Sequence, residues 1–91
     1  MLRIMPPPPV TFYRTVVIAT AKPRRLRVVG SVREAAEALV RDWPEGGRGP
    51  ATNAATRACL AALEGTGSVE KARTTFSAAA KEMDIYVREG R

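Results

Sequence analysis

The sequence contains no histidine and a single cysteine, and these two shortages exclude much of the chemistry that small proteins perform. Histidine is the commonest general base and the commonest metal ligand, so the usual catalytic and metal-binding arrangements are missing. One cysteine, Cys59, permits neither an internal disulfide nor a zinc site of several thiolates. We therefore expect a protein that is not an enzyme, with no cofactor, no metal and no identifiable small-molecule substrate.

Long hydrophobic runs are also absent. The apolar run at residues 16–21, for example, is far shorter than the roughly 20 apolar residues of a transmembrane helix. No segment has the hydrophobic core of a secretory signal peptide. We expect a protein with no membrane association that resides in the cytoplasm.

Acidic residues are missing from the first third of the chain. Residues 1–30 contain six basic side chains (Arg3, Arg14, Lys22, Arg24, Arg25 and Arg27) and no acidic ones, whereas residues 31–91 contain nine of each sign. The net charge of +6 therefore lies entirely in the N-terminal third. Such a region attracts phosphates or carboxylates of a partner.

The chain divides into a tail and one domain. Four consecutive prolines at residues 6–9 favour an extended polyproline conformation and resist packing into a sheet. We predict a disordered proline-rich tail over residues 1–9 and a single α+β domain over residues 10–89. A chain of 91 residues is near the lower end of the lengths that build their own core.

An antiparallel β-hairpin is predicted at the start of the domain. Residues 10–20 are rich in β-branched and aromatic side chains, residues 22–24 (Lys-Pro-Arg) favour a turn, and residues 25–30 form a second strand. In the first strand Phe12, Val16 and Ile18 share one face, which Arg14 interrupts, and Tyr13, Thr15 and Val17 share the other. In the second strand Leu26 and Val28 share one face, and Arg25, Arg27 and Val29 share the other.

Three helices are predicted to follow. Ser31 and Glu34 form a capping box, Pro50 suits the first position of the second helix and Gly65 suits its end, and Ser68 caps the third. The first helix has an apolar stripe of Val32, Ala35, Ala36, Leu39, Val40 and Trp43. The third has a stripe of Val69, Ala72, Phe76, Ala79, Ala80 and Met83. After it, Ile85 and Val87 either fold back onto the core or add a short extended segment.

The second helix is apolar around most of its circumference. Its broad band consists of Ala51, Ala54, Ala55, Ala58, Cys59, Ala62 and Leu63, while Leu60 points away from the band. A helix of this kind is usually buried on more than one side. We therefore predict a ββααα arrangement in which this helix is central.

These residues resemble those of a known family. The shared pattern is Trp43-Pro44, then Arg48-Gly49-Pro50, Ala58-Cys59, Ala62 to Gly65, Ala72-Arg73, Phe76 and Ala79-Ala80. It resembles domain of unknown function 982, small bacterial proteins abundant in rhizobia and other alphaproteobacteria. The likeness extends from about Pro9 to Glu89, and it implies an α+β fold with no assigned activity.

Cys59 and Trp43 are interpreted as packing residues. Cys59 lies among alanines in the middle of a helix, without the exposure or the neighbouring cation that a reactive thiol needs. Trp43 continues the stripe of the first helix, which makes it a lid on the core rather than a stacking platform. No glutamate has the surroundings that would raise its pKa for acid–base work.

The basic hairpin is the one patch that suggests a partner. Arg14, Lys22, Arg24, Arg25 and Arg27 are placed to neutralise phosphates, in a sequence-independent and salt-sensitive manner. Arg48, next to a helix start, either contacts an anion or bonds to loop carbonyls. Two observations argue against nucleic-acid binding: the aromatic content is low, and the sequence has no helix-turn-helix, RRM or KH signature. We favour a non-enzymatic interaction module, forming a homodimer or binding another protein, with nucleic-acid binding as the alternative.

Overall fold

The computed structural model describes residues 11–20, 25–44 and 49–90. Its elements are β1 (Thr11–Thr20), β2 (Arg25–Ser31), α1 (Val32–Arg41), α2 (Pro50–Glu64), α3 (Val69–Glu82) and β3 (Tyr86–Glu89). The predicted α+β fold, a hairpin followed by three helices, is confirmed, and a short C-terminal strand completes it. The predicted tail at 1–9, the turn at 22–24 and the glycines at 46–47 lie outside the described residues.

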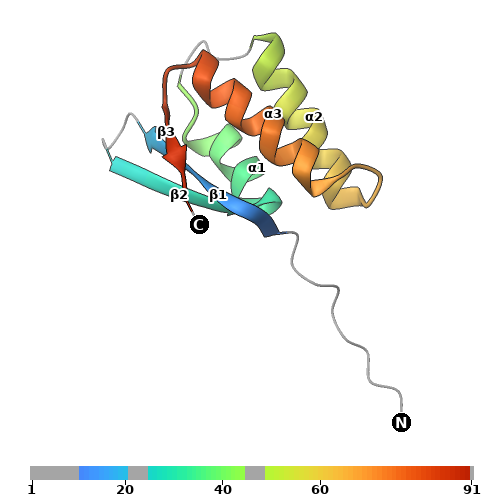
Figure 1. Cartoon of the computed structure of the whole chain (residues 1–91). Coiled ribbons are helices and arrows are strands. Elements are labelled where there is room, and N and C mark those ends of the chain that lie inside the picture. Colours follow the sequence, from blue (N-terminus) through green and yellow to red (C-terminus); the bar gives the residue numbers. More distant parts are fainter. Residues whose placement is uncertain (1–10, 21–24, 45–48, 91) are drawn as a thin grey trace.

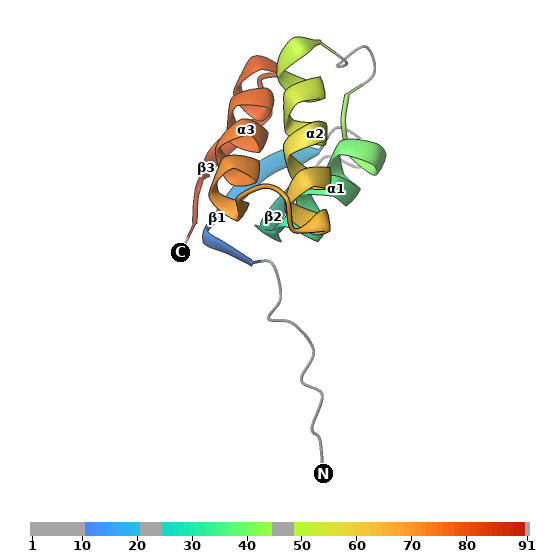
Figure 2. The ribbon, with the colours of Figure 1, turned by 90° about the vertical axis from the view of Figure 1, so that its right-hand side faces the viewer.

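The three strands form one antiparallel sheet with the order β2-β1-β3. All the helices lie on one face of this sheet (Figures 1 and 2). Helix α1 packs on β2, α3 packs mainly on β1, and α2 packs on α3 and α1. The other face of the sheet is therefore not covered by any of the described elements.

β1 supplies the centre of the core. Phe12, Val16 and Ile18 are buried against the helices, as the alternation predicts. Val29 of β2 is buried on the same face, whereas Leu26 and Val28 are exposed on the other. The inner face of β2 is thus the one that also contains Arg25 and Arg27.

The C-terminal residues add a strand, which confirms one of the two predicted alternatives. Asp84, at φ 60°, and the bonds Asp84 N–H to Lys81 O (3.1 Å) and Ile85 N–H to Ala80 O (2.9 Å) end α3 in a Schellman motif. The chain then reverses, and Tyr86–Glu89 pairs with β1 on the side away from β2. β1 is consequently the central strand, and β2 and β3 are the edges.

The predicted capping residues of the helices are confirmed, whereas α1 ends at Arg41, before Trp43, which the predicted stripe included. Ser31 Oγ accepts a hydrogen bond from Glu34 N–H (3.1 Å), and Glu34 returns one by accepting from Gly30 N–H (2.7 Å). Gly65 adopts φ 84° at the end of α2, a left-handed conformation that glycine adopts without steric cost. Ser68 caps α3 by accepting from Lys71 N–H (2.9 Å).

α2 lies between α1 and α3 in the helical layer (Figure 2), which confirms its central position among the helices. Its buried residues are Thr52, Ala55, Cys59 and Ala62, a narrower set than the predicted band. Leu63 is 42% exposed, and Val40 of α1, predicted to be buried, is 76% exposed. Both predictions were wrong because α2 packs chiefly on α1 and α3 and has no comparable contact with the sheet, so the outer flanks of α1 and α2 face solvent.

None of the helices in the described part of the chain is long and apolar enough to cross a membrane.

Candidate interaction surfaces

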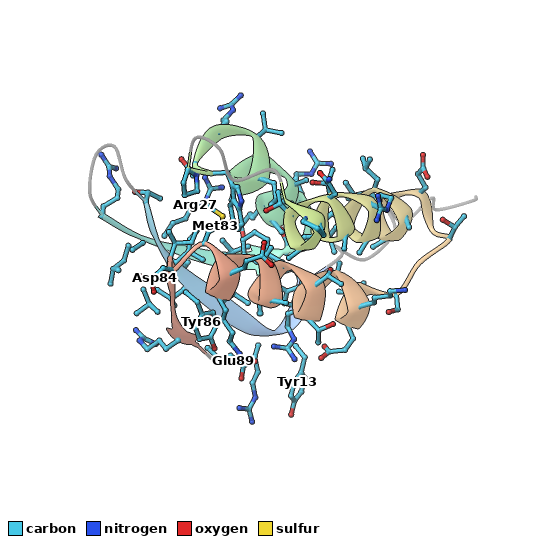
Figure 3. The ribbon with its side chains drawn as sticks, turned by 90° about the horizontal axis from the view of Figure 1, so that it is seen from above. Tyr13, Arg27, Met83, Asp84, Tyr86 and Glu89 are labelled. Atoms are coloured by element: carbon cyan, nitrogen blue, oxygen red, sulfur yellow. The ribbon has the colours of Figure 1, made fainter. Side chains whose placement is uncertain are left out.

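The open face of the sheet, meaning the face of β1, β2 and β3 turned away from the helices, exposes several large apolar side chains. Leu26 and Val28 of β2 are 59% and 57% exposed, and Tyr13 of β1 is 84% exposed. Figure 3 shows Tyr13 projecting away from the body of the molecule. Exposed apolar residues that lie together on one face are a common mark of an interaction site.

Val17, in the middle of this face, is only 2% exposed. Its two cross-strand partners are Val28 of β2 and Arg88 of β3. Residues paired in this way project to the same face, so Arg88 also lies on the open face. Glu89, the only acidic residue of the three strands, bonds instead to Arg73 of α3.

Arg27 was a candidate phosphate contact, and the structure shows it bonded to an acidic residue of α1 and to the acidic residue that caps the end of α1. Its guanidinium donates to Asp42 and lies 3.4 Å from Glu37 Oε1. These bonds hold β2 against the end of α1. Arg27 is therefore already neutralised within the fold.

The other arginines and the lysine predicted as phosphate contacts differ in their surroundings. Arg14 Nη1 lies 3.8 Å from Glu89 Oε2, and its guanidinium lies 5.9 Å from the centre of the Tyr13 ring. Arg25 is exposed and has no ion pair with the described residues. The remaining candidates, Lys22, Arg24 and Arg48, lie outside the described residues. The structure therefore brings Arg14 and Arg25 to the hairpin surface and directs Arg27 inward.

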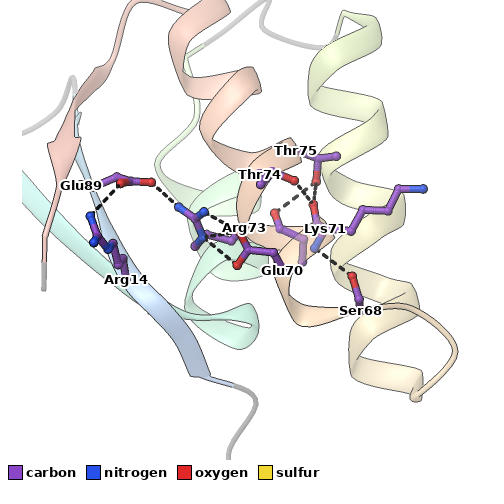
Figure 4. Close-up of polar contacts among 9 residues, drawn as sticks. Arg14, Ser68, Glu70, Lys71, Arg73, Thr74, Thr75 and Glu89 are labelled. Carbon is purple, nitrogen blue, oxygen red and sulfur yellow. Dashed lines mark hydrogen bonds and ion pairs between the residues drawn. The ribbon is translucent and has the colours of Figure 1, made fainter.

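Arg73 joins α3 to the C-terminal strand (Figure 4). Its Nε lies 3.0 Å from Glu70 Oε1, and its Nη1 donates to Glu89. The hydrogen bond from Arg73 lowers the pKa of Glu70, and the bond to Glu70 raises the pKa of Arg73 further above its ordinary value. Glu70 and Arg73 are three positions apart on α3, whereas Glu89 reaches Arg73 only through the tertiary structure, so the sequence alone did not indicate this junction.

A small apolar groove separates α1 from α2. Its volume is about 110 Å³, and its lining consists of Ala36, Leu39, Val40, Thr56, Cys59 and Leu60. Val40 (76% exposed) and Leu60 (52% exposed) form its two rims. The outward direction predicted for Leu60 is confirmed.

Cys59 and Trp43, the two residues interpreted from the sequence as packing residues, both lie in or against the core. Cys59 is 1% exposed, and burial raises the pKa of its thiol to about 11, so it is a packing residue as interpreted from the sequence. Trp43 packs on the core with its ring 5.5 Å from that of Phe76. The described residues contain no group of three or more Cys, Asp or Glu side chains placed to hold a metal ion.

The chain matches one protein-family model. Residues 14–87 match the family described as Protein of unknown function (DUF982), and the chain belongs to that family. No significant match is found among curated proteins or among solved structures.

Proposed function

We propose that this member of the DUF982 family is a non-enzymatic interaction module that binds another protein through the open face of its sheet. The observation that carries the proposal is the exposure of Leu26 and Val28 (59% and 57%) on a sheet whose other face holds the core. A two-layer domain normally hides its apolar side chains between the layers. Apolar side chains on the outer face of the sheet are stabilised by the hydrophobic effect only when a further surface covers them.

The charge of the open face indicates the chemistry of the partner. Arg88 lies on this face, and none of the described strand residues there is acidic. Two copies stacked through this face would bring like charges together, which costs free energy. We therefore propose a partner segment that combines apolar side chains with aspartate or glutamate. Strand β2, as a sheet edge, offers it backbone donors and acceptors as well.

The same features support a role without catalysis. A nucleophilic thiol must ionise near neutral pH, whereas the pKa of Cys59 is about 11 and its side chain is buried. The ion pairs of Arg27 with Glu37 and of Arg73 with Glu89 tie elements of the fold together. Their arrangement is that of a scaffold that holds a surface in place.

The proposal is tested by site-specific photo-crosslinking in living cells. A benzophenone amino acid replaces Val28 on the open face, or, as the matched control, Ala78 on the exposed side of α3. We expect ultraviolet light to produce a protein adduct from position 28 and not from position 78. Absence of an adduct at position 28, or equal adducts at both positions, would refute the proposal.

Nucleic-acid binding by the hairpin remains the second candidate, and one observation favours it. Tyr13, 84% exposed, stands beside Arg14, and an exposed aromatic next to a cation is a stacking platform for unpaired bases. In the crosslinking experiment this function would appear as a nuclease-sensitive adduct at position 28.

Fluorescence anisotropy tests the second candidate directly. Labelled single- and double-stranded nucleic acid is titrated at low and moderate salt with the natural chain, with Arg24→Ser/Arg25→Ser, and with the control Arg33→Ser/Arg41→Ser, which loses the same charge from α1. Arg27 is retained in every variant because it bonds to α1. Salt-sensitive binding that only the hairpin variant loses would establish this function, and no binding at either salt would exclude it.

A further inference from the structure

Helix α2 has only two charged residues, and they lie on either side of Leu60. Arg57 precedes Leu60 by three positions and Glu64 follows it by four. Both are exposed, and neither has an ion pair with the described residues. A base and an acid at nearly equal distances from an exposed leucine make this surface complementary to itself.

The three side chains project in similar directions. At about 100° per residue, Arg57, Leu60 and Glu64 fall within roughly 60° of one another around the helix axis. This arc is turned away from the buried residues Ala55, Cys59 and Ala62, which face the core. The charged pair and the leucine can therefore meet a single partner helix at the same time.

We propose that two copies of this chain associate through α2, antiparallel and related by a twofold axis that passes close to Leu60. This inference goes beyond the proposed function and concerns a surface different from the open face of the sheet. In an antiparallel pair the residue before the axis on one helix meets the residue after it on the other. Arg57 of each copy then meets Glu64 of the other, which gives two equivalent ion pairs around a leucine contact.

The alternative orientation is disfavoured by the same charges. In a parallel pair Arg57 would face Arg57 and Glu64 would face Glu64, so two attractions would become two repulsions. The charge pattern also favours a second copy over an unrelated helix, since no other charge on α2 has to be matched.

The groove between α1 and α2 provides the apolar part of the contact. Its volume of about 110 Å³ and its lining, chiefly Ala36, Leu39 and Cys59 below the rims, suit an aliphatic side chain. An apolar cavity of about 150 Å³ holds a benzene ring, so the groove, at about 110 Å³, has room for the four carbons of a leucine side chain. Leu60 of the second copy enters this groove, and the exposed Val40 closes over it.

Charge-reversal variants test the arrangement by sedimentation velocity and equilibrium over micromolar to several hundred micromolar protein. Arg57→Glu and Glu64→Arg each turn two attractions into two repulsions, and we expect each to dimerise about tenfold or more weakly than the natural chain. Equimolar mixing of the two variants restores both ion pairs, because position 57 of either copy then faces an opposite charge at position 64. The double variant Arg57→Glu/Glu64→Arg restores them within one chain.

Matched controls separate the specific contact from net charge. Lys71→Glu and Glu82→Arg make the same charge changes at exposed positions of α3, and they should leave dimerisation unchanged. Circular dichroism confirms that every variant is folded. A natural chain that stays monomeric throughout this range would overturn the inference, as would reversed variants that dimerise normally or a mixture that does not recover. None of these results bears on crosslinking at position 28, so the two proposals fail separately.

Discussion

The bond between Trp43 and Thr52 is the most informative perturbation, because it joins the end of α1 to the first turn of α2. The indole Nε1–H donates to Thr52 Oγ1 at 3.0 Å, and Thr52 is only 1% exposed. Trp43→Phe removes the donor and keeps an aromatic ring near Phe76. Thr52→Val removes the acceptor and keeps the shape of the side chain. The two substitutions therefore isolate one hydrogen bond.

The expected size follows from the burial of the acceptor. A hydrogen bond contributes about 0.5–1.5 kcal/mol net, and a buried polar group left without its partner costs about 1–3 kcal/mol. We expect Trp43→Phe to lower the free energy of unfolding by about 2 kcal/mol, since it leaves the Thr52 hydroxyl unsatisfied and removes apolar area. Thr52→Val should cost about 1 kcal/mol, because water can reach the indole N–H of the half-buried Trp43.

A double-mutant cycle measures the bond itself. Urea unfolding of the natural chain, both single variants and the double variant is followed by circular dichroism, because Trp43→Phe removes the only tryptophan fluorophore. The coupling energy should be about 1 kcal/mol, and a single substitution that costs 1 kcal/mol lowers the Tm by about 4–8 °C in a domain of this size. Additive effects, with a coupling energy close to zero, would show that the bond does not connect the two helices energetically.

Three further predictions concern single residues. Gly65→Ala should lower the free energy of unfolding by about 1 kcal/mol and Asp84→Gly should raise it by up to about 1 kcal/mol, because both positions need a left-handed conformation that suits glycine best. Urea unfolding that showed both variants stabilised, or both destabilised, would contradict this. Cys59, with its pKa raised to about 11, should react with Ellman's reagent at pH 8 about a hundredfold more slowly in the folded chain than in denaturant, and equal rates would place the thiol at the surface. The bond from Arg73 lowers the pKa of Glu70 in the fold, so its stabilisation is complete above the unfolded pKa and is lost as the pH falls through the folded one; unfolding curves from pH 6 to 3 should be less acid-sensitive for Glu70→Gln, and parallel slopes would exclude this contribution.

The fold was largely predictable because its signals are local. A capping serine followed by glutamate, a proline at a helix start and a glycine at a helix end each act within a few residues of Ser31, Pro50 and Gly65. The strand alternation likewise placed Phe12 and Ile18 in the core. Each of these features depends only on the conformation of its own segment.

The position of β3 and the exposure of Val40 were not predictable in the same way. β3 joins the sheet because β1 has a free edge, and that edge exists only once the hairpin and the helices are assembled. Val40 belongs to an apolar stripe, but whether a flank of the stripe is covered depends on how α2 crosses α1. The ion pairs of Arg27 and Arg73 depend on tertiary proximity too, which is why Arg27 was predicted as a phosphate contact and not as a partner of α1.

The two proposed surfaces lie on opposite sides of the molecule, and this separation has a functional consequence. The helices occupy one side of the sheet and the open face occupies the other (Figure 1), so a dimer formed through α2 leaves both open faces accessible. Such a dimer is bivalent, and two linked sites bind a partner with repeated or paired segments far more tightly than one site does. Reversing the charge at Arg57 should therefore weaken the binding of a dimeric partner while leaving the intrinsic affinity of each open face unchanged. A monomeric partner segment bound equally by the natural chain and by Arg57→Glu would demonstrate that independence, whereas a parallel loss of both would mean that the open face is formed only in the dimer.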